Sequence, residues 1–289
     1  MRIKLTLALA AVVLPILLSA QERVSVRGRI VNEKGEAVEY VQVGVPRHQI
    51  GTIGTADGRF EISTPPDTLE FFHVSYQAAR FPVTGPVDDL VIVLHENELA
   101  PAVFIDGNTK EKYLLRSGAN VLGNGGLAVY TLQEGRTTGK EVGSVAQVKK
   151  PFLVKDISLP VRSNHIPGCI ASINIYRIEG KNETFVNVLH KPIYFDVAVS
   201  DKPQKYNLQP EETLLLEPGK YFIAFQVVGC DGQAMEAFLA KPEEERKFWE
   251  MTLDFSIYLK SSYVRETALG EMKRLPINTG IAVRGLEFQ

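Results

Sequence analysis

The stretch VSVRGRIVNEKGEAVEYVQVGV (residues 24–45), followed by GTADGRFEI (residues 54–62), is the part of the sequence that most directly determines the fold. In both halves of the first stretch, valine or isoleucine alternates with polar residues or glycine, which is the two-residue period of strands with one buried face. Turn-forming residues at 32–35 separate the halves. The pair Asp57-Gly58 predicts a hairpin in the second stretch, because it adopts positive φ at low cost between strand formers. These residues therefore predict a module of short β-strands.

The same stretch resembles the carboxypeptidase-regulatory-like (transthyretin-like) domain, and the resemblance covers roughly residues 24 to 105. The residues that carry it are Gly28, Gly35, Val38, Val41, Val43, Gly51, Gly54, Thr55, Asp57, Gly58 and Phe60, followed by residues 69–77 and 89–94. The resemblance implies a seven-stranded sandwich, of a kind common at the N-terminus of secreted and outer-membrane proteins of Bacteroidetes. It also implies a non-catalytic module, so it transfers no active-site residues.

The first twenty residues are typical of a cleavable export signal. Arg2 and Lys4 precede an apolar run at residues 5–18, and small residues end at Ala20 before Gln21. The run is shorter than the roughly 20 residues that a membrane-spanning helix needs, so a membrane anchor is the weaker alternative. We therefore expect an exported protein, located in the periplasm or at the cell surface, with no membrane span after cleavage.

The charge balance argues against nucleic acid as a partner. The chain has 32 basic and 34 acidic residues, and removal of Arg2 and Lys4 leaves 30 and 34, a net charge of −4 for the mature chain. A chain of this charge has no general attraction for nucleic acid or an anionic membrane. The expected partner is an envelope protein or a surface glycan of unknown identity.

The mature chain is longer than a typical domain, so we expect two. The prediction is all-β: a signal at residues 1–20, the seven-stranded sandwich at 21–105, a glycine-rich linker at 106–140, and a second, jelly-roll-like β-sandwich at 141–289. Eight runs of strand-forming residues support the second sandwich: residues 143–148, 156–161, 169–178, 193–199, 213–217, 221–228, 251–260 and 276–288. One short helix is expected at residues 241–249, with Pro242 in its first turn.

Two cysteines, Cys169 and Cys230, follow the predicted signal. Each lies at the end of an apolar run, and antiparallel pairing of the two runs would place the cysteines side by side. Because exported proteins meet an oxidising environment, a disulfide is the first interpretation. Two buried free thiols are the alternative. Neither interpretation makes the cysteines catalytic, since no Cys-x-x-Cys motif is present.

A possible binding surface is formed by Trp249, Tyr258, Tyr263 and Arg265, because aromatic and arginine side chains are enriched at recognition faces. The competing interpretation is that these side chains pack in or beside the core. Thr68 follows Asp67 and precedes Leu69, which matches a short O-glycosylation acceptor motif of Bacteroidetes. It is therefore a possible modification site.

No motif predicts an enzyme or a cofactor site. His95 and Glu98 have the His-x-x-Glu spacing of a zinc peptidase, but that chemistry needs a third ligand and an α/β domain that this chain lacks. We expect no catalytic residue, no metal and no cofactor. The sequence favours a non-catalytic exported binding or adaptor protein of the cell envelope. The alternatives are a carbohydrate-binding accessory protein and, less favoured, a hydrolase whose active site leaves no local motif.

Export predicts cleavage after Ala20, so the mature protein should begin at Gln21. Mass spectrometry of the intact protein from the envelope fraction measures this directly. Recovery of a chain that still starts at Met1 would contradict the prediction.

Overall fold

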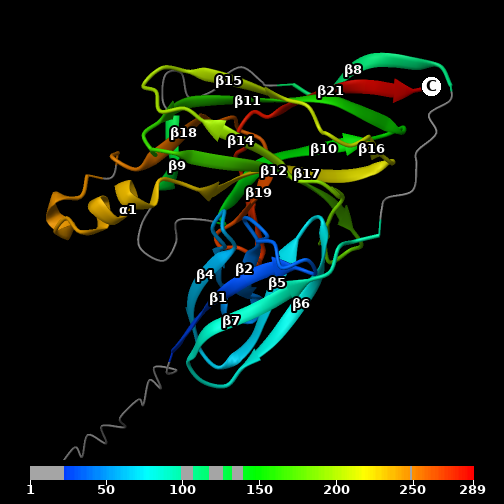
Figure 1. Cartoon of the computed structure of the whole chain (residues 1–289). Helices are drawn as coiled ribbons and strands as arrows, with labels where there is room; N and C mark the ends of the chain where they lie inside the picture. Colours follow the sequence, from blue (N-terminus) through cyan, green and yellow to red (C-terminus); the bar gives the residue numbers. More distant parts are fainter. Residues whose placement is uncertain (1–22, 99–106, 117–125, 132–138, 248) are drawn as a thin grey trace, which may run out of the picture.

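The computed structural model describes residues 23–98, 107–116, 126–131, 139–247 and 249–289, and it confirms the all-β class. Two β-sandwiches are stacked one on the other (Figure 1). The predicted signal peptide at residues 1–20 lies outside the described residues.

The first sandwich contains the seven strands that the resemblance implies. Sheet A has the order β4-β1-β7 and sheet B the order β3-β2-β5-β6. Their bounds are β1 (Val24–Asn32), β2 (Gln42–Val45), β3 (Ile50–Ile53), β4 (Arg59–Thr64), β5 (Asp67–His73), β6 (Tyr76–Val83) and β7 (Val87–Leu94), with a 3-10 turn η1 (Pro46–His48) between β2 and β3.

The alternation in the sequence sets which side chains enter this sandwich. Val26 and Ile30 of β1 are fully buried, whereas Arg27 and Arg29 between them are exposed. The predicted Asp-Gly turn joins β3 to β4, and Gly58 has a φ of 77°, in the left-handed region, as expected for glycine at a tight turn. The core therefore follows directly from the two-residue period.

The second sandwich also has two sheets. Sheet C has the order β8-β21-β11-β18-β9, with β15 and β16 added on β11, and sheet D has the order β13-β12-β17-β10-β19-β20, with β14 added on β12. Their bounds are β8 (Thr109–Leu115), β9 (Gly126–Thr131), β10 (Glu141–Val148), β11 (Phe152–Asn164), β12 (Cys169–Glu179), β13 (Thr184–Asn187), β14 (Ile193–Val197), β15 (Gln204–Leu208), β16 (Leu215–Leu216), β17 (Gly219–Gly229), β18 (Thr252–Ser256), β19 (Ser262–Arg265), β20 (Met272–Leu275) and β21 (Ala282–Phe288).

Two features of this sandwich differ from the sequence-based expectation. The stretch 106–140, expected as a linker, contributes β8, which pairs with β21, and β9, which pairs with β18. The helix is α1 (Gly232–Leu239) rather than residues 241–249, where only the 3-10 turn η2 (Glu243–Glu245) forms. The reason is the cap: the Asp231 side chain accepts hydrogen bonds from the backbone N–H groups of Gln233 and Ala234 and so starts the helix earlier.

Sheet D is the central layer of the molecule. One of its faces packs against sheet C across a large apolar core, where the rings of Phe225 and Phe255 meet edge to face at 4.8 Å. Its other face is turned towards the first sandwich (Figure 1). Consequently eight consecutive residues of β17, from Tyr221 to Val228, are buried. Within the described part of the chain, no helix is long and apolar enough to cross a membrane.

Candidate functional site

The contact between the two sandwiches is built around one buried histidine. His73, at the end of β5, lies with its Nε2 atom 3.2 Å from the hydroxyl oxygen of Tyr194 on β14. Its Nδ1 atom accepts a hydrogen bond from the backbone N–H of Ser75, so the proton of the neutral ring is on Nε2 and is donated to Tyr194. Burial lowers the pKa of His73 to about 4, which keeps the ring neutral near pH 7.

Further contacts hold the same interface. The rings of Tyr40 and Tyr194 meet edge to face at 5.0 Å. The Ser75 hydroxyl donates to the carbonyl of His190, and the Gln49 side-chain oxygen accepts from the backbone N–H of Glu271. The interface therefore combines apolar packing with hydrogen bonds at both of its ends.

A buried polar network lies beside this interface on sheet D. Glu141, on β10, is fully buried and accepts hydrogen bonds of 2.7 Å from both Asn174 and Tyr176 of β12. Arg265, on β19, forms an ion pair with Glu141, in which Nη1 of the arginine lies 3.1 Å from Oε2 of the glutamate. Gln226 completes the network by accepting a hydrogen bond from Asn174. The four strands of the sheet's centre are thus joined by side chains as well as by their backbones.

The electrostatics of this network depend on the pairing of opposite charges. Burial raises the pKa of Glu141, and the charge of Arg265 with the hydrogen bonds from Tyr176 and Asn174 opposes that shift. Burial acts to lower the pKa of Arg265, but the neighbouring carboxylate of Glu141 raises it, so the guanidinium group stays charged. The pair is an ion contact without aligned hydrogen bonds, since Nε of Arg265 and Oε2 of Glu141 have no hydrogen-bond partner. Each charge therefore depends on the other for its compensation.

A small cavity lies between the network and the histidine. A cavity of about 20 Å³ is lined by residues of both sandwiches, among them Gln42, His73, Asn174, Tyr194 and Gln226. A cavity of this size has space for about one water molecule. The polar groups that line this cavity come from both sandwiches and thus join them.

The four residues predicted as a binding surface do not lie together. Arg265 belongs to the buried network, and Tyr263 is buried in an aromatic cluster with Tyr176, Phe185 and Phe222. For these two side chains the prediction of an accessible surface is wrong, because β19 pairs with β10 on one side and β20 on the other and is covered by its neighbours.

Tyr258 and Trp249 have different environments. Tyr258 is half-buried and packs against Gly280, where an added Cβ atom would lie 2.1 Å from the ring. Trp249 is 52% exposed, and the Nζ atom of Lys247 lies 5.8 Å from its ring centre. Trp249 is therefore the one member of the predicted set that is accessible to a partner.

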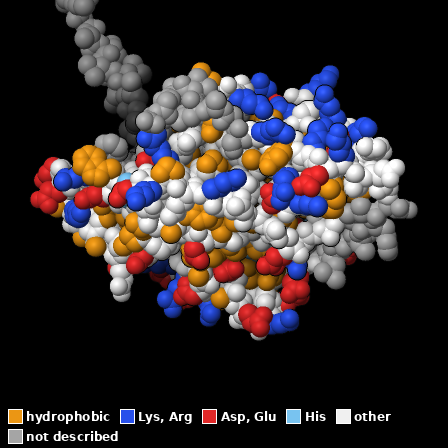
Figure 2. All heavy atoms as spheres, turned by 90° about the horizontal axis from the view of Figure 1, so that it is seen from above, with side chains coloured by type: hydrophobic (Ala, Val, Ile, Leu, Met, Phe, Trp, Pro, Cys, Tyr) orange, Lys and Arg blue, Asp and Glu red, His pale blue; other side chains and the backbone are white. Residues whose placement is uncertain are grey.

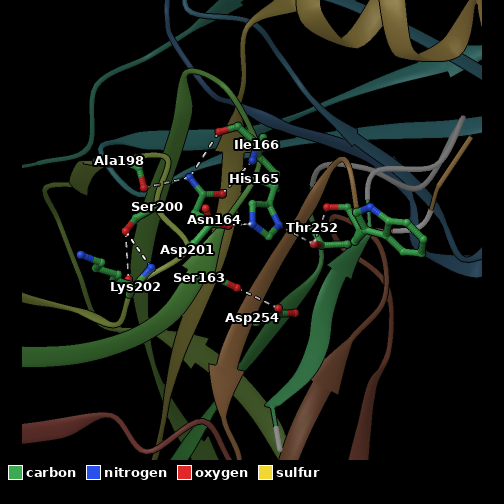
Figure 3. A network of polar contacts seen from close by, with 11 residues as sticks. Ser163, Asn164, His165, Ile166, Ala198, Ser200, Asp201, Lys202, Thr252 and Asp254 are labelled. Atoms are coloured by element: carbon green, nitrogen blue, oxygen red, sulfur yellow. Dashed lines mark hydrogen bonds and ion pairs between the residues drawn. The ribbon is translucent and has the colours of Figure 1, made fainter.

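A second polar network holds the strand ends beside Trp249 (Figure 3). The His165 ring connects the Asp201 carboxylate, at 2.8 Å from Nε2, with the Thr252 hydroxyl, at 3.4 Å from Nδ1. That hydroxyl also bonds to the carbonyl of Trp249. The order carboxylate, imidazole, hydroxyl is that of a hydrolase triad, but the Thr252 side chain is buried among the strands. The network fixes the loops on either side of β11 and β18.

The Asn164 side chain extends this network on the other side. Its amide nitrogen donates a hydrogen bond of 2.8 Å to the carbonyl of Val197. Its side-chain oxygen accepts a hydrogen bond from the backbone N–H of Ile166 (Figure 3). Because Asn164 is fully buried, these bonds satisfy a side chain that would otherwise be costly to bury. The end of the sandwich that carries Trp249 is therefore rigidly supported.

The two strands that contain the cysteines pair as predicted, but Cys169 and Cys230 do not lie at disulfide distance. Ile170, next to Cys169, pairs with Gly229, next to Cys230, so the antiparallel pairing brings the two strand ends together. Both residues are free cysteines that pack against the core of the second sandwich, which corresponds to the alternative of two free thiols. Burial raises the pKa of Cys169 to about 12, and the nearby Cys230 adds to the shift. Burial also raises the pKa of Cys230, so both side chains are in the protonated, less nucleophilic form at neutral pH.

The remaining predicted features can be placed as follows. His95 contacts Glu33 at 2.8 Å rather than Glu98, and the described residues contain no group of three or more possible metal ligands. Thr68 is exposed on β5, which is compatible with modification and leaves O-glycosylation a prediction.

Charged side chains of both signs lie next to each other on the face that sheet C presents to solvent (Figure 2). Arg284 contacts both Asp156 and Glu111, and Lys112 contacts Glu287 at 2.7 Å. These pairs offset the basic character of β8. This face therefore offers no extended surface of one sign, in agreement with the overall charge balance.

Comparison with known proteins identifies no family. No family model matches the chain, and no curated protein is similar to it. Among solved structures, a DUF3823 family protein from Bacteroides ovatus ATCC 8483 is 7% identical to this chain, with a TM-score of 0.21. The match covers 71% of this chain and 97% of that protein's chain. A DUF3823 family protein from Parabacteroides merdae ATCC 43184 is 9% identical, with a TM-score of 0.21. That match covers 89% of this chain and 97% of the other chain.

A streptococcal ancillary pilin has 8% identity and a TM-score of 0.21, covering 73% of this chain and 60% of the pilin. These scores are too low to carry a function to this chain. The functional argument rests on the geometry of the chain itself.

Removal of one partner of the buried ion pair between Glu141 and Arg265 is expected to be strongly destabilising. Arg265→Met should lower the free energy of unfolding by about 3–5 kcal/mol, because it leaves a buried carboxylate without its cation. The double variant Glu141→Gln/Arg265→Met should recover part of the loss. Urea unfolding measures each value. The matched control is Arg27→Met, whose partner Glu61 is exposed, with an expected loss below about 1 kcal/mol. Equal losses in the two Arg→Met variants would contradict this assignment.

His73 predicts a loss of stability in weak acid. The pKa of His73 is about 4 in the folded chain and about 6.5 when unfolded, so between these values only the unfolded chain binds the proton. The free energy of unfolding should fall as the pH drops from 6.5 to 4, by up to about 3 kcal/mol, and this contribution should be fully present above pH 6.5. Urea unfolding across this range should show a shallower fall for His73→Gln, whereas the exposed His95→Gln should follow the wild type. Parallel curves for wild type and His73→Gln would refute the prediction.

Proposed function

We propose that this chain is an exported, non-catalytic binding or adaptor protein of the cell envelope, in which two sandwiches form a scaffold for a protein partner. The observation that carries this proposal is where the most deeply buried of the perturbed titratable groups lie. His73 and Tyr194 lie in the contact between the sandwiches, and Glu141 lies inside sheet D. The cavity beside them has room for about one water molecule. An enzyme would instead have such groups converge on an open pocket large enough for substrate.

The surface around Trp249 is the best-supported site for the partner. Exposed tryptophan is a frequent energetic anchor in protein interfaces, because it buries a large area at a low cost in conformational entropy. Lys241 and Glu250 form an exposed ion pair nearby in the chain, and Lys247 lies over the indole ring. An apolar anchor with charged residues around it is the usual composition of an interface centre and its rim.

The carbohydrate-binding alternative has less support. Flat sugar sites need a platform of exposed aromatic rings, and among the described side chains of large apolar residues only two aromatic ones are strongly exposed, Trp249 and Tyr113. Tyr113 is on β8 and Trp249 precedes β18, which lie towards opposite edges of sheet C. Each ring also has a cation near one face, Arg116 in the case of Tyr113. The two rings therefore do not form one platform.

Trp249→Ala should weaken capture of the protein partner by at least about tenfold, the loss expected for an interface anchor. Full-length mature protein is incubated with native envelope extract and treated with an amine-reactive crosslinker, and the crosslinked peptides are identified by mass spectrometry. Crosslinks are expected at Lys241 and Lys247 and should be lost in Trp249→Ala.

The matched control is Tyr113→Ala, which removes an exposed aromatic ring at the other edge of sheet C and should leave the crosslinks unchanged. Crosslinks confined to Lys110 and Lys112, or capture that survives in Trp249→Ala, would reject the Trp249 surface. Binding of glycans that is abolished by Trp249→Ala would favour the carbohydrate-binding alternative instead.

A further inference from the structure

A second cavity lies in the second sandwich, and its lining residues are different from those of the cavity beside His73 and from the Trp249 surface. Its volume is about 120 Å³. It is placed between β10, β19 and β20 of sheet D and the segments that follow β18 and β20. The apolar residues that line it are Val142, Ile257, Val264, Leu275 and Ile277. Nothing in the proposed function uses this cavity.

The cavity contains one polar group that has no partner. Thr279 is 4% exposed, and its hydroxyl oxygen makes no hydrogen bond. The side-chain oxygen of the neighbouring Asn278, which also lines the cavity, accepts a hydrogen bond from the backbone N–H of Gly280. A buried hydroxyl without a partner is unfavourable, so a ligand that supplies one hydrogen bond at this point would be favoured.

Two charged residues complete the lining, and they neutralise each other. The Nζ atom of Lys140 lies 3.0 Å from the carboxylate of Glu266, and both side chains are partly exposed. They therefore mark the side of the cavity that faces solvent. Because the charges of Lys140 and Glu266 are opposite and the other lining residues are uncharged, an ionised ligand would lose its hydration without gaining a free counter-ion. The cavity thus selects for a neutral molecule.

We propose that this cavity is a binding site for a small neutral molecule with one apolar ring and one hydroxyl group, of the phenol class. The size supports a single ring, since an apolar cavity of about 150 Å³ is known to bind benzene. The apolar wall holds the ring, and the Thr279 hydroxyl forms a hydrogen bond with the hydroxyl of the ligand. This inference does not depend on the proposed binding function.

The test is a titration of the full mature chain with phenol, followed by methyl NMR. Shifts are expected for the methyl groups of Val142, Val264 and Ile257, while methyl groups of the first sandwich, such as Val26, stay unchanged. Toluene, which has the same ring without the hydroxyl, should bind about fivefold more weakly, the value of one hydrogen bond to a buried group. n-Pentanol tests whether the site requires a ring.

Two kinds of variant separate the roles of the ring and the hydroxyl. Thr279→Val keeps the shape of the side chain and should remove the preference for phenol over toluene, whereas Thr184→Val on the exposed strand β13 should not. Val264→Phe should fill the cavity and abolish binding of both probes, and the control Val199→Phe adds the same ring at an exposed position. If Val264→Phe does not fold, Ile277→Phe fills the cavity from its half-buried loop.

The proposal would be overturned by the absence of shifts at the cavity methyl groups up to the solubility limit of phenol, or by shifts that persist in the filled variant. An equal affinity for phenol and toluene in the wild type would remove the role of Thr279 and with it the proposed class of ligand. Tighter binding of n-pentanol than of phenol would likewise overturn the requirement for a ring.

Discussion

The burial of β17 on both faces is the constraint on which the rest of the molecule depends. Strands of a β-sandwich ordinarily bury one face and expose the other, and their sequences alternate accordingly. In β17, residues such as Phe225 face sheet C, and Phe222 and Val228 lie on the opposite face, which is covered as well. A strand with no exposed face has to be nearly all apolar, and the run YFIAFQVV meets this condition.

The polar residues of sheet D follow from the same constraint. Because Gln226 interrupts the apolar run on a covered face, it cannot be hydrated and has to find partners inside the protein. It accepts from Asn174 and donates to the carbonyl of Gly139. Glu141 is directly opposite Gln226 in the pairing of β10 with β17, and Arg265 is opposite Glu141 on β19. One row of residues across the sheet therefore contains all the charges that the layer buries.

Much of this fold could be predicted from the sequence, because local patterns determine the strands. The seven strands of the first sandwich and the long strands β10, β11, β12, β17 and β21 all have a visible apolar period or run. Shorter strands such as β19 and β20 have no such signal, since four residues are too few to show a period. Their pairing decides whether Tyr263 and Arg265 are exposed, so the exposure of these side chains could not be predicted. Trp249 differs because it lies in a loop before β18, and its side chain is half exposed there.

The contact between the sandwiches explains why glycine is needed at two positions of the first one. Gly44 and Gly51 are opposite each other in the pairing of β2 with β3. A Cβ atom at Gly51 would lie 2.0 Å from the carbonyl oxygen of Ala268, and one at Gly44 would lie 3.0 Å from it.

Ala268 is itself fully buried, so the loop after β19 can approach the first sandwich this closely only where side chains are absent. The next residue, Leu269, has a φ of 59°, an unfavourable conformation for leucine that the surrounding contacts must maintain. Gly51 was one of the residues that indicated a transthyretin-like module. In this chain the same residue also determines how closely the second sandwich packs against the first.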